Sequence, residues 1–238
     1  ESDERINAIL PIREFIDDQF IFMATESGTV KKTLLKEFEK PRANGKIAID
    51  LRDNDTLVGV AVTDGSKDVM LFASSGKVAS FNESDVRKMG RTAGGVRGMR
   101  LKENESIISL IISQPGTVLT LTENGYGKRT QVEEYPIHKR GGQGVIAMQT
   151  SERNGALVGA VLVDEADELM LITDGGTLVR TRTSEISILG RNTQGVRVIK
   201  PGNKEKVIGL DRIASLEDEE SDEALADEDS SIVDEVKD

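Results

Sequence analysis

The chain has no cysteine and no tryptophan, and only 3% of its 238 residues are aromatic. The absence of cysteine excludes a disulfide framework and thiolate chemistry. Because aromatic rings are scarce, the core has to be built from Val, Ile, Leu and Met. A single histidine, His138, leaves no partner imidazole for a metal site.

No stretch approaches the roughly 18 apolar residues of a membrane span, and no signal-peptide pattern opens the chain. The sequence also lacks a nucleotide-binding glycine loop, a nucleophile with a histidine partner, and metal-spaced acidic residues outside the C-terminal end. We therefore expect a cytoplasmic module without a catalytic site, a membrane contact or a cofactor of its own. Because it begins at Glu1 rather than Met, we expect a piece of a longer protein.

The net charge of −11 is concentrated at the C-terminal end. Residues 216–238 contain 12 acidic residues and one basic residue, and removing them from the totals of 42 and 31 leaves 30 of each sign in residues 1–215. With few apolar residues to bury, 216–238 is expected to be a disordered acidic tail. The body is neutral, so its attraction to a charged partner depends on where its charges lie.

Three sets of markers recur along the chain at nearly constant intervals. The turn glycines, at intervals of 48, 49 and 51, are Gly28, Gly76, Gly125 and Gly176. The second glycines, at intervals of 50, 49 and 51, are Gly45, Gly95, Gly144 and Gly195. A hydrophobic pair recurs every 50 residues at Val58-Gly59, Ile108-Ser109, Val158-Gly159 and Ile208-Gly209. Three markers in one register indicate an internal repeat.

We interpret the chain as four copies of a unit of about 50 residues, followed by the first strand of a fifth. The copies cover 4–55, 56–105, 106–155 and 156–205, and the stub covers 206–215. The stub has no remainder of its own unit to pair with. We expect it to pair with a unit upstream of Glu1 or to pack on the fourth copy, in an open arc.

Each copy has the pattern of short strands. Apolar runs such as 69–72, 118–121 and 169–172 end at turn residues, and the strand after the turn alternates. Four strands in about 50 residues are typical of one blade of a propeller-like array. The predicted fold is all-β, with a β-pinwheel as the favoured architecture and an open sandwich of hairpins as the alternative.

Basic residues follow the same register. Four positions before the second glycine stand Arg91, Arg140 and Arg191, with Arg42 one step along in the first copy. A second column after the turn glycine holds Lys32, Arg129 and Arg180. The other candidates in these stretches are Lys31, Arg87, Lys88, Arg97, Arg100, Lys128, Lys139, Arg182 and Arg197. Charges at one phase of a repeat are expected to form a basic rail that contacts DNA phosphates, and the alternative is a solvated surface.

Three stretches resemble the C-terminal domain of DNA gyrase A, from the bacterial type IIA topoisomerase. They are 25–33 (Thr-Glu-Ser-Gly-Thr-Val-Lys-Lys-Thr), 124–130 (Asn-Gly-Tyr-Gly-Lys-Arg-Thr) and 190–196 (Gly-Arg-Asn-Thr-Gln-Gly-Val). A box-like motif similar to that family's Gln-Arg-Arg-Gly-Gly-Lys-Gly is formed by His138, Lys139, Arg140, Gly141, Gly142, Gln143 and Gly144. His138 and Gln143 depart from the family pattern, so we interpret the motif as a degenerate internal copy.

The resemblance implies a six-bladed β-pinwheel that wraps duplex DNA, with its first blades upstream of Glu1. It also implies a parent enzyme that uses ATP and Mg on other domains or other chains to supercoil DNA in the bacterial nucleoid. The expected partners are duplex DNA, the upstream breakage domain and the gyrase B protein, in a heterotetramer. Neither Tyr126 nor Tyr135 is expected to cleave DNA, and Tyr126 is interpreted as a packing residue.

Two other functions stay open from the sequence. A propeller of the WD40 or kelch kind would be a protein-interaction scaffold, although the Trp-Asp and Gly-His signatures are missing. The equivalent domain of topoisomerase IV shares the repeat and usually lacks a proper box. For the acidic tail, the hypothesis is an intramolecular mimic of DNA that competes for the basic rail, and the alternative is a solubilising segment.

Overall fold

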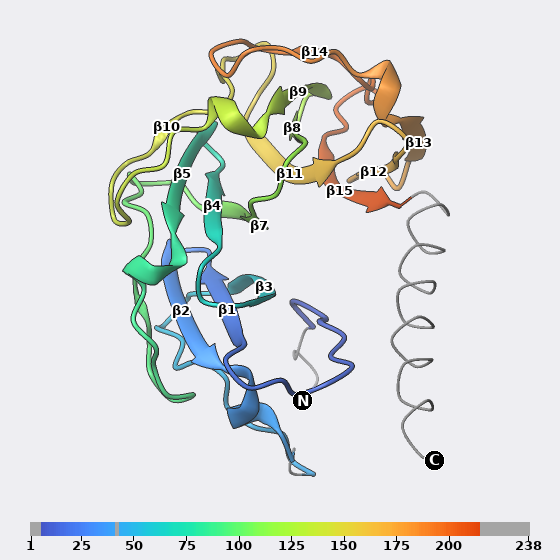
Figure 1. Ribbon diagram of the computed structural model, residues 1–238. Helices are drawn as coiled ribbons and strands as arrows, with labels where there is room; N and C mark the ends of the chain where they lie inside the picture. Colours follow the sequence, from blue (N-terminus) through green and yellow to red (C-terminus); the bar gives the residue numbers. More distant parts are fainter. Residues whose placement is uncertain (1–5, 41–42, 215–238) are drawn as a thin grey trace, which may run out of the picture.

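The computed structural model describes residues 6–40 and 43–214, which form short strands joined by turns. Four antiparallel sheets follow one another along an arc that is open between the first sheet and the fourth (Figure 1). This is the propeller-like all-β architecture that the repeat predicts. The acidic tail and Arg42 lie outside the described residues.

The first three sheets share one strand order. In the first sheet the order is β3 (Leu57–Thr63), β1 (Phe20–Thr25), β2 (Thr29–Leu34) and β6 (Val96–Arg97). The second contains β7 (Ile107–Ile112), β4 (Asp68–Ala73), β5 (Lys77–Asn82) and β10 (Val145–Ile146). The third contains β11 (Leu157–Val163), β8 (Thr117–Thr122), β9 (Tyr126–Gln131) and β14 (Val196–Arg197).

The fourth sheet has three strands among the described residues, β15 (Val207–Ile213), β12 (Glu168–Thr173) and β13 (Leu178–Arg182). A short 3₁₀ turn follows the second hairpin strand of every sheet. These turns are η1 (Leu35–Phe38), η2 (Glu83–Asp85), η3 (Val132–Glu134) and η4 (Thr183–Glu185).

Each sheet is assembled from two consecutive sequence copies. The hairpin β1–β2 comes from the first copy, whereas β3 and β6 on its two sides come from the second. In the second and third sheets, likewise, the two flanking strands come from the copy that follows the hairpin. For the same reason 206–215 does not start a fifth sheet: β15 pairs with β12 and completes the fourth. This is one of the two placements expected for that strand.

The turn glycines are the points where the next copy docks. The N–H groups of Val198 and Ile199 both donate to the Gly125 carbonyl, at 2.9 and 3.2 Å. Gly28 and Gly76 accept the same pair of bonds from the copy that follows each of them. Gly125 has φ +78°, which a residue with a side chain rarely adopts.

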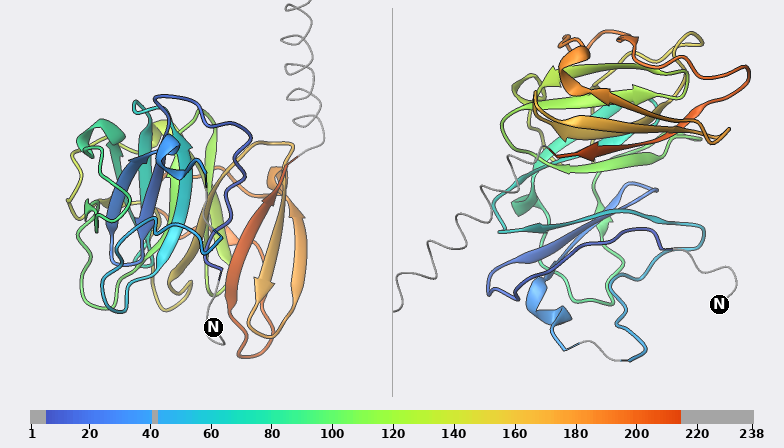
Figure 2. Two further views of the ribbon diagram at one scale, coloured as in Figure 1. Left: turned by 90° about the horizontal axis from the view of Figure 1, so that it is seen from below. Right: turned by 90° about the vertical axis from the view of Figure 1, so that its right-hand side faces the viewer.

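Neighbouring sheets lie against each other (Figure 2), and three hydrophobic clusters each combine residues of two neighbouring sheets. As expected from the composition, these clusters are mostly Val, Ile, Leu and Met. Aromatic residues also belong to these clusters. In the second, Phe72 packs edge-on against Tyr135 with ring centroids 5.8 Å apart. Tyr126 is also buried in the second cluster, as predicted.

Candidate nucleic-acid interface

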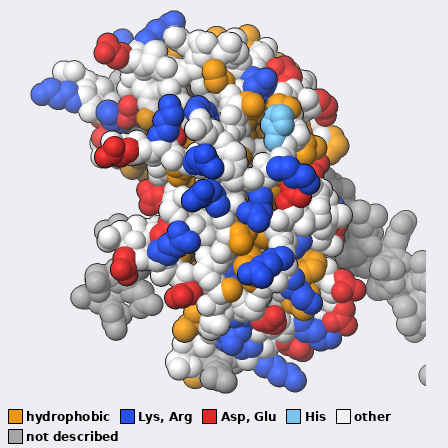
Figure 3. Space-filling model, turned by 90° about the vertical axis from the view of Figure 1, so that its left-hand side faces the viewer, with side chains coloured by type: hydrophobic (Ala, Val, Ile, Leu, Met, Phe, Trp, Pro, Cys, Tyr) orange, Lys and Arg blue, Asp and Glu red, His pale blue; other side chains and the backbone are white. Residues whose placement is uncertain are grey.

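The short strands β6, β10 and β14 lie at the outer edge of the first three sheets. Figure 3 shows this side of the molecule, where Lys and Arg side chains form a band along the middle and acidic side chains lie mostly toward its margins. Since residues 1–215 are neutral overall, the band results from the separation of charges and not from their excess.

Seven of the predicted residues have exposed side chains and form what we call the exposed basic set. They are Arg87, Lys88, Arg97, Arg100, Lys139, Arg182 and Arg197. Lys139 is paired with Asp85 at 2.8 Å. Arg180 is exposed as well, but its guanidinium is bound by Glu168 of the neighbouring strand. Apart from Lys139, no member of the exposed basic set forms an ion pair within the part of the chain that the structure describes, which leaves those side chains available to a polyanion.

Four predicted residues are instead inside the protein: Lys31 and Lys128, and Lys32 and Arg129 of the second column. Lys31 and Lys128 are 0% exposed. The Lys128 ammonium donates to the carbonyls of Gly190 and Arg191 at 2.5 and 2.6 Å. The Lys31 ammonium donates to Ala48 and to Arg91 in the same way. A charge that is satisfied internally by two carbonyls is not a phosphate contact.

Lys32 and Arg129, one position further along, are 5% and 4% exposed. Lys32 donates to the Glu83 carbonyl at 3.0 Å and lies 3.5 Å from the Glu83 carboxylate. Arg129 donates to the Ile186 carbonyl at 2.7 Å and to the Glu165 carboxylate at 2.5 Å. These pairs connect the first copy to the second and the third to the fourth. The alternation of the sequence did not reveal this, because a basic residue on a strand between two sheets can face a junction or the solvent.

The buried lysines predict an unusual dependence of stability on pH. Burial lowers the pKa of Lys31 and of Lys128 from 10.5 to about 8. Between these values the unfolded chain binds more protons than the folded one, so the free energy of unfolding should rise as the pH goes from about 8 to 10.5.

The double variant Lys31→Met, Lys128→Met removes both titrating groups and serves as the comparison. Urea unfolding at several pH values should show a rise in the wild type that is larger than in the variant. Parallel curves for the two proteins across this pH range would show that the two lysines do not titrate with a lowered pKa.

Arg91, Arg140 and Arg191 make the same contact at the same position of their copies. Each guanidinium donates to a backbone carbonyl of the preceding copy, at the second residue after the second glycine. The acceptors are Ile47 at 2.9 Å, Arg97 at 2.9 Å and Ile146 at 2.6 Å, respectively. Arg140 also donates to the Asp85 carbonyl at 2.8 Å. We call these three residues the latch arginines, because each holds two consecutive copies together.

The latch arginines are half-buried, and their contact with phosphate stays a prediction. The sequence did carry the signal for the latch: one arginine recurs at one phase of the repeat. A residue that recurs at the same position of each copy can contact one long ligand that passes all the copies, or it can make the same contact between each copy and its neighbour. The spacing alone does not distinguish these two roles.

The box-like motif is a loop docked on the second copy. The N–H of His138 donates to the Ser80 carbonyl at 2.8 Å, and the N–H of Gly141 donates to Gly98 at 2.5 Å. His138 and Gln143 are exposed, while Gly141 and Gly144 have φ +82° and +71°. These glycines provide the turns that bring the loop against its neighbour.

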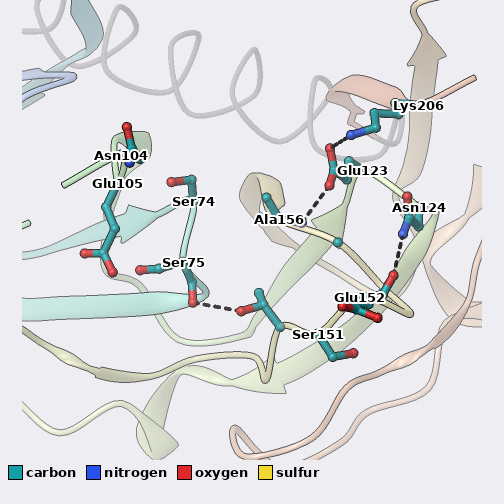
Figure 4. Close-up of a pocket in the computed structure, with 12 residues that line it drawn as sticks. Ser74, Ser75, Asn104, Glu105, Glu123, Asn124, Ser151, Glu152, Ala156 and Lys206 are labelled. Carbon is teal, nitrogen blue, oxygen red and sulfur yellow. Dashed lines mark hydrogen bonds and ion pairs between the residues drawn. The ribbon is translucent and has the colours of Figure 1, made fainter. Parts of the chain in front are cut away.

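Figure 4 shows a pocket that lies among the turns on another part of the molecule. It is lined by Glu105, Glu123 and Glu152 together with serine and asparagine side chains. The Lys206 ammonium in its wall is bound to the Glu123 carboxylate at 2.6 Å. An acidic wall of this kind disfavours phosphate, so the candidate interface is the basic band.

Within residues 6–40 and 43–214, no helix has the length and apolar character needed to cross a bilayer. In the same residues, His and acidic side chains form no group suited to a metal ion.

The repeat matches a family model described as "DNA gyrase C-terminal domain, beta-propeller" at residues 19–64, 67–114, 116–164 and 167–214. The chain belongs to the DNA gyrase C-terminal domain family. Each matched segment contains the hairpin of one sheet and the long strand that follows it, whereas the short strands β6, β10 and β14 fall in the next segment. The resemblance inferred from the turn and box residues is confirmed.

Curated relatives that carry the name of DNA gyrase A support this assignment. The protein from Salmonella typhimurium (strain LT2) is 55% identical over 94% of this chain, and that from Escherichia coli (strain K12) is 56% identical over 92%. The chain spans about a quarter of their length, 26% and 25%. By the family description, the matched part is the C-terminal domain of DNA gyrase.

Two solved structures share the fold. A DNA gyrase A C-terminal domain superposes with a TM-score of 0.76 at 26% identity, covering 85% of this chain and 68% of that one. The C-terminal domain of DNA topoisomerase IV gives 0.83 at 28% identity, covering 90% and 67%. The fold is thus common to both enzymes, and the sequence relatives identify the gyrase branch.

Proposed function

We propose that this gyrase domain binds duplex DNA along its outer rim, without sequence preference, and bends it around the arc of sheets. The observation that carries the proposal is the exposed basic set on a body with 30 charges of each sign. Lys and Arg contacts to phosphate position a duplex but do not read its bases. A curved row of such contacts favours a bent duplex, since bending lets more phosphates reach the protein.

For the parent enzyme, the proposal is that wrapping supports negative supercoiling driven by ATP. The ATP, the Mg and the DNA-cleaving tyrosine would belong to the upstream breakage domain and to the gyrase B protein. The named relatives are bacterial, and we propose that the enzyme acts in the cytoplasm at the nucleoid.

We also propose that further blades precede the described ones in the parent protein. In the first copy, the counterpart of the short outer strands β6, β10 and β14 is 46–47, which lies in no sheet among the described residues. Ile47 in that segment is 64% exposed. A segment whose three counterparts each complete the sheet of a preceding copy fits the outer edge of an upstream blade.

The proposal predicts salt-dependent binding with little sequence preference. Fluorescence anisotropy with two unrelated duplexes of equal length should give similar affinities. The logarithm of the binding constant should fall linearly with the logarithm of salt concentration, by about 0.9 per phosphate contacted. Relaxation of a closed circular plasmid in the presence of the chain should leave supercoils, because wrapped DNA is protected. No binding at low salt, or binding to one duplex alone, would contradict the proposal.

A further inference from the structure

A pocket of about 510 Å³ lies beside the first hairpin turn and is lined by three arginines. Ser27 and Thr29 contribute hydroxyl groups from the turn between β1 and β2. Arg52 comes from the loop before β3, and Arg97 and Arg100 come from the segment that begins with β6. All three arginine side chains are exposed. The pocket therefore collects positive charge from two copies at one point of the rim.

The charges of this pocket are not balanced by carboxylates in its wall. Among the described residues, no acidic side chain lines the pocket or forms an ion pair with its arginines. The neighbouring carboxylate, Asp55, accepts the N–H and hydroxyl of Ser27 at 2.9 and 2.6 Å. Three guanidinium groups around one cavity repel each other, and an anion in the cavity would relieve that repulsion.

The third sheet has a counterpart at the same place. There Tyr126 occupies the position of Thr29, and it pairs in the sheet with Arg197 as Thr29 pairs with Arg97. The Arg197 guanidinium donates to the Tyr126 hydroxyl at 2.5 Å, and its central carbon lies 4.5 Å from the ring centroid. Arg153, from the loop before β11, lies 4.9 Å from the same centroid.

Tyr126 thus holds two exposed guanidinium groups near one hydroxyl. Its pKa is lowered by the hydrogen bond from Arg153 and by the positive charge of both arginines. In the second sheet, the equivalent pair is Lys77 and Ile146, so no arginine stands there. Of the three sheets whose fourth strand is described, only the first and the third have an arginine at this position.

We propose that these two places are discrete phosphate sites, each of which holds a phosphate of the duplex backbone with two or more arginines. Arginine suits this role because its planar guanidinium donates two parallel hydrogen bonds to phosphate oxygens. The sites would fix the duplex at two points separated by one sheet, and the remaining exposed charges would attract it diffusely. The inference rests on the proposed binding of DNA.

The sharpest test compares two triple variants with equal loss of charge. The pocket variant is Arg52→Gln, Arg97→Gln, Arg100→Gln. The control variant is Arg87→Gln, Lys88→Gln, Lys102→Gln, which removes three exposed charges of the same copy from outside the pocket. Both sets of side chains are exposed, so both variants should keep the wild-type melting temperature.

Three arginines that share one phosphate should change the salt slope by about 0.9 when all are removed, whereas three independent contacts should change it by about 2.7. Single pocket substitutions should each weaken binding nearly as much as the triple, by roughly tenfold, because the remaining arginines no longer enclose the phosphate. For the control residues, the losses of binding free energy in the three single variants should add up to the loss in the triple variant. A pocket variant with an unchanged slope, or with three additive single effects, would overturn the discrete site.

Two further measurements separate this inference from the proposed function and from a free ligand. If the wild-type chain does not bind DNA, the proposed function fails first. If inorganic phosphate titrated at constant ionic strength binds the wild type, and the pocket variant loses that binding but keeps its DNA affinity, the pocket serves free phosphate and the proposal is overturned. The variant Arg153→Gln, Arg197→Gln tests the third sheet independently, with an expected slope change of about 0.9.

Discussion

Replacing Gly125 by alanine should lower the free energy of unfolding by about 3 kcal/mol or more, whereas the same change at Gly176 should cost about 1 kcal/mol. A Cβ on Gly125 would lie 2.2 Å from the carbonyl oxygen of Ile199, which belongs to the backbone that docks there. A Cβ on Gly176 would have nothing within 4 Å. The next copy must therefore move away from Gly125 but not from Gly176.

The two glycines form a matched pair because their backbones are alike. Gly125 has φ +78° and Gly176 has φ +82°, so the strain of a left-handed alanine is common to both variants. The difference between the losses of unfolding free energy in the two variants therefore measures the clash of the Gly125 variant with the following copy. Urea unfolding of both variants measures it, with an expected difference of about 2 kcal/mol or more. Equal losses at the two positions would show that docking of the next copy at Gly125 does not limit stability.

Replacing all three latch arginines by alanine should destabilise the chain by about 3 kcal/mol, or about 1 kcal/mol for each lost hydrogen bond. For a domain of this size, that corresponds to a melting temperature lower by roughly 6–12 °C. The expected loss follows from the bonds to Ile47, Arg97 and Ile146, which connect consecutive copies. Without those contacts, a surface arginine would be expected to change stability by about 0.5 kcal/mol or less.

The triple Arg87→Gln, Lys88→Gln, Lys102→Gln is the control for the latch variant, because it also removes three positive charges. It should change the salt slope of DNA binding by up to about 2.7 while the melting temperature stays the same. The latch variant should show the opposite pattern, with lower stability and a smaller change in slope. If the latch variant keeps the wild-type stability and its salt slope of DNA binding changes by about 2.7, these arginines contact phosphate and do not hold the copies together.

Much of the fold could be predicted from periodicity. The spacing of Gly28, Gly76 and Gly125 predicted the hairpin turns, and apolar runs such as 118–121 predicted the buried strands. What periodicity could not decide was which copy completes a sheet. A repeat has the same spacing wherever its boundary is drawn, so the exchange of β3 and β6 into the first sheet requires the pairing itself.

The candidate interface was predicted less completely. Of the basic residues predicted to contact phosphate, Arg87, Lys88 and Arg97 are exposed, and their contact with DNA stays a prediction. Lys31 and Lys128 were predicted as candidates for the rail, yet both side chains are buried and donate to backbone carbonyls. Arg52 and Arg153 were not predicted at all, since they come from loops outside the repeating columns.

By itself, the sequence determined the repeat, the strand and turn chemistry, the family and the neutral body with its acidic end. These depend on residue types at a fixed spacing, which a chain carries before it folds. Only the tertiary structure decided which basic residues face water, which hold neighbouring copies together and which converge on one pocket. Those outcomes depend on contacts between residues far apart in the chain, such as Arg91 and Ile47 at 44 positions or Lys128 and Arg191 at 63 positions. The residue type is the same whether a basic side chain makes such a contact or faces water, so the sequence alone does not distinguish the two.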